Sequence, residues 1–110
     1  MANDPDTVVK EFKQAVNLTP SALERWLSRP ESKEVGWGEG ESVGHRSGRR
    51  IVELKRTKKA DLTDDDRAHM RKVVGYVKRH LAQGPPKEDA RHSRWRYSLM
   101  NWGHDPLKRR

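Results

Sequence analysis

The segment TDDDRAHMRKVVGYVKRHLAQG, from Thr63 to Gly84, decides the fold. Its apolar residues recur at the intervals of one helix face: Met70, Val73, Val74, Val77 and Leu81. Thr63 is a favourable N-cap, and Asp66 three positions later completes a capping-box pattern. Gly84 and the two prolines after it end the helix. The segment therefore predicts a long helix with one buried face. Its three consecutive aspartates are interpreted as capping residues rather than a metal site.

Two shorter helices are predicted nearer the N-terminus. The first has a buried face made of Val8, Phe12, Ala15 and Val16. The second begins at Pro20, because Thr19 can cap it and proline is favoured at the first helical position. Leu18 and Leu23 occupy the two positions of a hydrophobic staple around that cap. Pro30 is expected to end this helix.

Another helix is predicted before the long one, from Glu41 or Ser42 to about Lys58. Its inner face is marked by Val43, Ser47, Ile51 and Leu54. Gly44 and Gly48 lie four residues apart and so share one side of this helix. Glycine inside a helix costs about 1 kcal/mol relative to alanine. Two on one side indicate close packing against another helix, which is favoured over room for a phosphodiester backbone.

A final helix is predicted within residues 88–106, with an apolar face of Trp95, Leu99 and Trp102 and with Gly103 as C-cap. The chain is thus expected to form one all-α domain, a small bundle of four or five helices over residues 1–110. Flexible ends are expected at about 1–4 and 107–110, and a glycine-rich loop at about 33–41. Trp37, in that loop, could stack on a base, but closure over the edge of the core is preferred.

Composition limits the classes of protein that the chain can represent. The 110 residues carry a formal net charge of +8, which favours a polyanionic partner. The absence of cysteine excludes disulfides, thiolate zinc sites and cysteine nucleophiles. No apolar run approaches the roughly 18 residues that span a bilayer, and the N-terminus lacks the pattern of a signal peptide. A cytoplasmic location is therefore expected.

Positive charge is concentrated in residues 44–60, which hold seven Lys and Arg against one Glu, whereas residues 1–43 have a net charge of −3. Arginine and lysine side chains bind phosphate oxygens, and arginine does so in a bidentate fashion. The candidate nucleic-acid-binding residues are Arg46, Arg49, Arg50, Lys55, Arg56, Lys58, Lys59, Arg67 and Arg71. The alternative is that these cations only keep a small protein soluble.

Enzymatic motifs are missing from the sequence. No GxSxG, SxxK, P-loop or HExxH pattern occurs, and the five histidines show no metal-ligand spacing. We therefore expect no catalytic residue, no metal and no cofactor. His69 and His80 border the apolar stripe of the long helix, and half-buried, hydrogen-bonded core positions are favoured for both.

Three stretches together resemble a known family: AVNLTPSALERWL (15–27), GESVGHRSGRRIVELKRTKKADLTDDDRAHMRKVVGYVKRHLAQ (40–83) and WRYSLMNWGHDPLK (95–108). It is a family of short proteins, common in actinobacteria and also met in fungi, that is grouped as a domain of unknown function. Its members are often labelled DNA-binding protein. The resemblance implies no operator, cofactor or catalytic residue, so it assigns no site residues here.

Charge and resemblance together predict a DNA-binding protein of nucleoid-associated or accessory type. It would contact the phosphate backbone of duplex DNA, with unknown sequence specificity. Two alternatives stay open. One is RNA binding, and the other is a protein-interaction module whose basic face docks an acidic partner or assembles a homodimer. Membrane binding is not expected, because the basic helices lack an exposed aromatic face.

Overall fold

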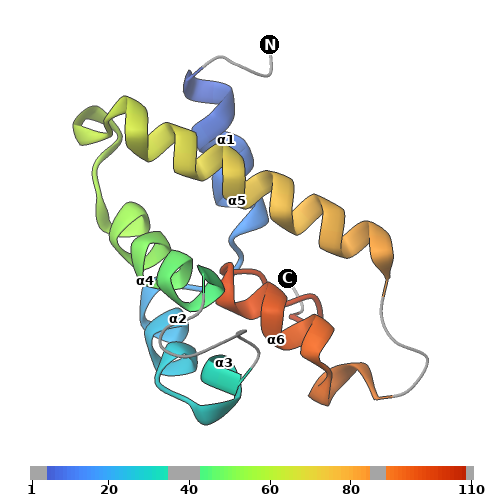
Figure 1. Cartoon of the computed structure of the whole chain (residues 1–110). Helices are drawn as coiled ribbons and strands as arrows, with labels where there is room; N and C mark the ends of the chain where they lie inside the picture. The colour runs from blue at the N-terminus through green and yellow to red at the C-terminus, as the bar shows by residue number, and fades with distance from the viewer. Residues whose placement is uncertain (1–4, 35–42, 85–88, 109–110) are drawn as a thin grey trace.

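The computed structural model describes residues 5–34, 43–84 and 89–108, and these segments form an all-α fold without strands (Figure 1). The α-helices are α1 (Pro5–Ala15), α2 (Pro20–Leu27), α3 (Pro30–Glu34), α4 (Val43–Arg56), α5 (Asp64–Gln83) and α6 (Arg94–Asn101). Two single 3-10 turns precede the last two helices, η1 (Lys59–Asp61) and η2 (Ala90–His92). The predicted all-α class is confirmed. The expected flexible ends at 1–4 and 109–110, and Trp37 in the expected loop, lie outside the described residues.

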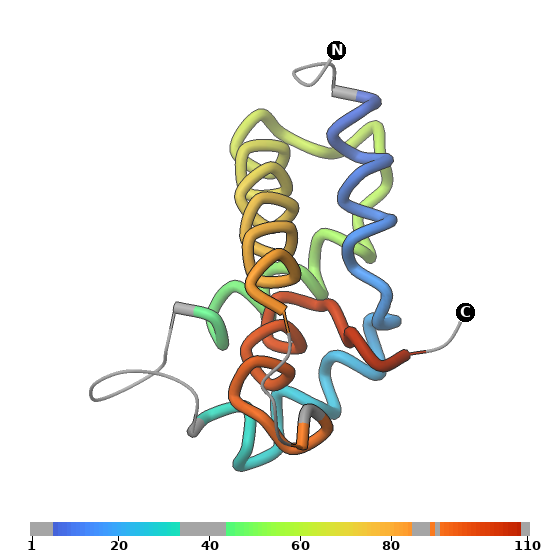
Figure 2. The backbone as a smooth tube through the Cα atoms, turned by 90° about the vertical axis from the view of Figure 1, so that its right-hand side faces the viewer, coloured from blue at the N-terminus to red at the C-terminus, as the bar shows by residue number. Residues whose placement is uncertain are grey.

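The helices are arranged as two pairs connected by α6 (Figure 1). In one pair α5 packs along α1, and in the other α4 packs along α2. Figure 2 shows α1 and α5 running side by side along the length of the molecule. Helix α6 contacts α2, α3, α4 and α5, so the C-terminal part of the chain holds the two pairs together.

Helix α5 begins as its sequence predicts. The Thr63 side chain accepts a hydrogen bond from the Asp66 backbone N–H at 3.1 Å, and the Asp66 carboxylate accepts one from the Thr63 N–H at 3.0 Å. The apolar stripe is buried from Met70 to Val77. Leu81 was wrongly assigned to it, because its side chain is 41% exposed. The last turn of α5 extends beyond the end of α1, which leaves it without that packing partner (Figure 1).

Helix α2 also begins as predicted, since Thr19 accepts a hydrogen bond from the Ala22 N–H at 3.1 Å, and Leu18 and Leu23 are both buried. Its end differs from the prediction. The helix stops at Leu27, and Pro30 is the first residue of α3. Proline suits a first helical turn as well as a termination, because its missing N–H would have no partner in that turn.

The last helix is shorter than predicted. Residues 90–92 form a separate 3-10 turn, and α6 begins at Arg94 after Ser93, whose side chain accepts a hydrogen bond from the Arg96 N–H at 3.1 Å. Serine competes for backbone hydrogen bonds in a way that favours a cap over a helix interior. The N-cap at Ser93 therefore sets a start that the apolar spacing alone did not reveal.

The glycine side of α4 faces other helices, as predicted. A Cβ atom on Gly48 would lie 2.6 Å from the backbone oxygen of Asn101 and 2.7 Å from Cδ2 of Leu27. A Cβ on Gly44 would lie 3.2 Å from Nε1 of Trp102. Both glycines thus let α4 approach α6 and, at Gly48, α2, so they do not make room for a ligand backbone. On the same helix Ser47, Ile51 and Leu54 are buried as predicted, while the side chain of Val43 lies outside those described.

A buried polar group lies under this contact. The side chain of Asn101 is 1% exposed, and its Oδ1 accepts hydrogen bonds from Trp26 Nε1 at 2.7 Å and Ser32 Oγ at 2.5 Å. Its Nδ2 donates to the backbone oxygen of Ser32 at 3.0 Å. One amide therefore connects α2, α3 and α6, and all three bonds are shielded from water, where such bonds have the greatest effect on specificity of packing.

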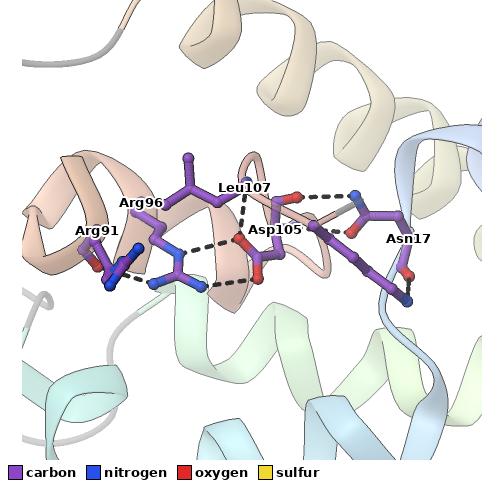
Figure 3. Close-up of polar contacts among 6 residues, drawn as sticks. Asn17, Arg91, Arg96, Asp105 and Leu107 are labelled. Carbon is purple, nitrogen blue, oxygen red and sulfur yellow. Dashed lines mark hydrogen bonds and ion pairs between the residues drawn. The ribbon is translucent and has the colours of Figure 1, made fainter. Parts of the chain in front are cut away.

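The segment after α6 returns to the connection between α1 and α2. Gly103 has φ of +84°, and the N–H groups of Gly103 and His104 donate to the carbonyls of Met100 and Leu99, which is a Schellman C-cap. The C-cap itself is Trp102, and Gly103, the predicted C-cap, takes the left-handed C′ position directly after it. Figure 3 shows the next contact, in which Arg96 donates two hydrogen bonds to the carboxylate of Asp105, at 3.0 and 2.9 Å.

Asp105 in turn exchanges two hydrogen bonds with Asn17: its N–H donates to Asn17 Oδ1 at 2.8 Å, and its carbonyl accepts from Asn17 Nδ2 at 2.9 Å (Figure 3). Lys108 also donates to the Asn17 carbonyl. Lys108 therefore contacts the α1–α2 connection, while the N–H of Leu107 donates to the Asp105 carboxylate. The expected flexibility of these two residues stays a prediction. Within the described segments, no helix is long and apolar enough to cross a membrane.

Candidate nucleic-acid interface

The outer side of α4 carries two of the predicted residues. Arg46 and Arg49 are exposed and lie three residues apart, which places them as neighbours on the helix surface. The opposite side of the helix carries the buried Ser47, Gly48 and Ile51. The amphipathic pattern of the sequence therefore places the two arginines toward solvent.

Arg50 connects this surface to α5. Its Nη2 lies 3.4 Å from Oδ1 of Asp66, and 41% of its side chain is exposed. One turn further along α5, Nε2 of His69 lies 2.9 Å from Oγ of Ser47 on α4. These two side-chain contacts join the first half of α5 to the middle of α4.

Lys72 completes the group of cations at this junction. Burial lowers the pKa of His69, and the positive charges of Arg50 and Lys72 lower that pKa further. The two cations, from different helices, therefore both act on one imidazole. We call the group formed by Arg46, Arg49, Arg50 and Lys72 the α4–α5 basic face. Lys72 was not among the predicted site residues, although its spacing of three from His69 could have indicated it.

Lys55 lies on the other side of α4. Its Nζ is 3.2 Å from the carbonyl oxygen of Val16 and 3.4 Å from that of Leu18, and its side chain is half-buried. Burial is the main cause that lowers the pKa of Lys55. The apolar stripe of α4 extends to this position, so Lys55 points between α1 and α2 and not onto the α4–α5 basic face.

The remaining cations near the end of α4 are distributed over other surfaces. Arg56 forms an ion pair with Glu24 on α2, and Nζ of Lys59 lies 2.6 Å from Oδ1 of Asp6 on α1. Lys58 is exposed at the start of η1. The run of basic residues that is continuous in sequence is thus divided among several sides of the molecule.

Arg67 and Arg71 lie on the side of α5 that is next to α1. Arg67 donates to the carbonyl of Leu62 at 3.0 Å and to Asp64 at 2.6 Å, which leaves 22% of its side chain exposed. Arg71 is exposed four residues later, and Lys78 on the same strip lies 3.5 Å from Glu11 of α1. Successive residues of a helix are about 100° apart, so Arg71 and Lys72 face different surfaces.

Four aromatic rings form a row that begins at His69, next to the α4–α5 basic face. The rings of His69, Trp102, Tyr76 and His80 stack in that order, with centroid separations of 6.3, 4.2 and 4.5 Å. His80 also lies 3.4 Å from the hydroxyl of Tyr76, and burial lowers its pKa. The prediction that His69 and His80 are half-buried, hydrogen-bonded core residues is confirmed. The described segments contain no group of three His, Asp or Glu side chains that could hold a metal ion.

Fold and surface define a small all-α domain in which an arginine-bearing helix is packed, through glycines, on the rest of the bundle. The chain belongs to the family described as Protein of unknown function (DUF3140), whose model matches residues 11–100. The match runs from the middle of α1 to the last turn of α6. It therefore includes the α4–α5 basic face and the helices α2 and α3, whose side chains contact Asn101. Comparisons with curated proteins and with solved structures returned no match.

Proposed function

We propose that this protein binds duplex DNA by contacting the phosphate backbone with the α4–α5 basic face. The observation that carries the proposal is the junction of α4 and α5, where Arg50 contacts Asp66 and His69 contacts Ser47. The exposed Arg46, Arg49 and Lys72 lie on the two helices that meet there. The Asp66 carboxylate contacts Arg50, and it already accepts the Thr63 N–H. The face thus carries four cationic side chains on two helices.

Arg49 and Arg50 follow Arg46 by three and four residues, so both are neighbours of Arg46 on the helix surface. Each guanidinium can donate two parallel hydrogen bonds to one phosphate group, so the three together are suited to several phosphates of one backbone. Phosphate contacts position a protein on DNA but carry no sequence information. We therefore propose binding with little sequence preference, and an accessory, nucleoid-associated role in the cell.

The salt dependence of binding gives the proposal a magnitude. If all four cations neutralise phosphates, the logarithm of the affinity falls with the logarithm of salt concentration with a slope of about −3.6. Between about 50 and 200 mM salt this slope lowers the affinity by about 150-fold. A surface that only solvates the protein would show no such binding.

The test is fluorescence anisotropy of a labelled random-sequence duplex, titrated with the full chain at the two salt concentrations. The double variant Arg46→Glu/Arg49→Glu removes two exposed cations and leaves the Arg50–Asp66 contact in place. We expect it to fold, by circular dichroism, and to bind about tenfold more weakly or worse at low salt. Unchanged affinity of this variant, or no salt-sensitive binding by the natural chain, would refute the proposal.

A matched pair of variants tests the assignment to one face. Lys72→Glu and Arg71→Glu change the charge equally, at adjacent exposed positions that face different sides of α5. Lys72→Glu should weaken DNA binding clearly more than Arg71→Glu. Equal effects would place the contact on the α1 side of α5 as well. Competition with duplex RNA of the same sequence then decides between the two nucleic acids.

A further inference from the structure

Three lysines that are distant in sequence meet on another side of the molecule. Lys13 comes from the last turn of α1, Lys55 from α4, and Lys108 from the segment after α6. The charges of Lys108 and Lys13 both lower the pKa of Lys55, after the larger effect of burial. Lys55 and Lys108 both contact backbone carbonyls of residues 16–18, and Lys13 lies one turn earlier in the chain, at the end of α1. We call these three residues the lysine cluster.

Backbone carbonyls at the end of α1 hold two of these lysines in place. Lys55 donates to the carbonyls of Val16 and Leu18, and Lys108 donates to the carbonyl of Asn17. These carbonyls follow the last residue of α1. The positions of the ammonium groups are thus set by the fold, and each of the two still has an N–H group available for a ligand, because an ammonium carries three donors.

Negative charge does not compensate the lysine cluster within the described residues. No Asp or Glu carboxylate of these residues lies within 4.0 Å of the ammonium nitrogens of Lys13, Lys55 or Lys108. A single lysine would be enough to satisfy carbonyls at a helix end. Three like charges repel one another and disfavour the compact state, so stability alone does not account for them.

The lysine cluster and the α4–α5 basic face lie on different sides of the molecule. Lys55 follows Arg46 by nine residues, which is two and a half helical turns, so the two side chains leave α4 on opposite sides, about 13 Å apart along its axis. Figure 2 shows the start of α4 on the left of the molecule, and α1, its connection to α2 and the segment after α6 on the right. A straight duplex that lies on one surface cannot also reach the other.

We propose that the lysine cluster is a second phosphate-binding site for DNA, so that one molecule connects two duplex segments. This inference rests on the proposed function, because it assigns the α4–α5 basic face to the first segment. Each site contacts the backbone of its duplex through ammonium or guanidinium groups, and neither requires a particular sequence. Both sites therefore bind the same ligand, the phosphate backbone of duplex DNA, and they differ only in which of the two duplex segments they hold.

The experiment is a bridging assay with two duplexes. One random-sequence duplex is immobilised on beads, a second carries a fluorophore, and the fluorescent duplex recovered with the beads is measured at about 50 mM salt. The variant Lys13→Glu/Lys108→Glu leaves the half-buried Lys55 in place. The control Lys10→Glu/Lys33→Glu makes the same change of charge at two exposed lysines outside the cluster.

We expect the natural chain and the control to recover the second duplex, and the cluster variant to recover at least about tenfold less. Its affinity for a single duplex in anisotropy should fall only about twofold, because one of two sites is lost. The milder variant Lys13→Gln/Lys108→Gln repeats the test if circular dichroism shows that the glutamate variant is unfolded. Bridging by the cluster variant equal to that of the control would overturn the inference, and it would indicate a dimer that uses one face per subunit.

Failure of the two proposals can be told apart. If the natural chain binds a single duplex in anisotropy but recovers no second duplex, the lysine cluster is not a DNA site and the α4–α5 basic face stands. If it binds no duplex at all, the proposed function fails, and the second site fails with it.

Discussion

Replacing Gly48 by alanine should destabilise the protein, although alanine is the better helix former by about 1 kcal/mol. The added Cβ would lie 2.6 Å from the Asn101 carbonyl oxygen and 2.7 Å from Cδ2 of Leu27, against contact distances of about 3.5–4.0 Å. The leucine can rotate, but the backbone of α6 cannot shift alone, because the Asn101 side chain is held by three hydrogen bonds. Overpacking of this kind costs about 1–3 kcal/mol, and the backbone contact favours the upper part of that range.

After the helix propensity is subtracted, we expect Gly48→Ala to lower the free energy of unfolding by about 1–2 kcal/mol. For a chain of 110 residues this corresponds to a Tm about 4–9 °C lower. Gly75→Ala on α5 is the control, because among the described residues its Cβ would approach Nη1 of Arg79, at 3.2 Å, which is the end of a flexible side chain. It should raise the Tm by about 2–4 °C.

Both variants can be measured by thermal unfolding followed by circular dichroism at 222 nm, with urea unfolding as a second determination of the free energy. A lower Tm for Gly48→Ala and a higher Tm for Gly75→Ala would show that packing, and not helix propensity, decides the residue at position 48. A Gly48→Ala protein that is as stable as the natural chain would contradict the close approach of α4 to α6.

Three further predictions concern buried and capping groups. Asn101→Ala leaves the Trp26 N–H, the Ser32 hydroxyl and the Ser32 carbonyl without their partner in the core. It should lower the free energy of unfolding in urea by about 2–5 kcal/mol, and a decrease below about 1 kcal/mol would contradict the buried network. Thr63→Ala removes one bond of the capping box and should cost about 1 kcal/mol, whereas Thr63→Ser should be nearly neutral, and equal losses would contradict a hydroxyl cap. Hydrogen bonding to the Thr63 N–H lowers the pKa of Asp66, so its ionised form stabilises the fold above about pH 4 and this contribution is lost as the pH falls below that value. The Tm difference between the natural chain and Asp66→Asn should therefore shrink from pH 7 to pH 3, and a constant difference would refute the assignment.

Local features of the fold could be predicted from the sequence, because they depend on residues within about one helical turn of each other. The capping box at Thr63, the cap at Thr19 and the C′ glycine at Gly103 are all of this kind. Errors occurred where two local signals competed. Pro30 can end a helix or begin one, and Ser93 can interrupt an apolar pattern by capping a later start.

The candidate site was predicted less completely, because its members are brought together by packing between helices. The sequence singled out Arg46, Arg49 and Arg50 on one helix, but a list of charges cannot show that Lys55 of the same helix points the other way into the α1–α2 junction. It also could not show that Lys72 of α5 and Arg50 of α4 both act on the same side chain, His69. DNA binding itself stays a prediction until the titrations are made.

By itself, the sequence determined most of the helical segments, where several of them are capped, which faces are apolar and where positive charge is concentrated. Each of these follows from neighbours along the chain. Only the tertiary structure decided which cations share a surface, because that depends on how α4 is rotated and how closely it lies against α2 and α6. Gly48 and Asn101 set that approach through contacts more than fifty residues apart in sequence. The same packing places Arg46, Arg49 and Arg50 of one basic run on the α4–α5 basic face and Lys55 of the same run in the lysine cluster.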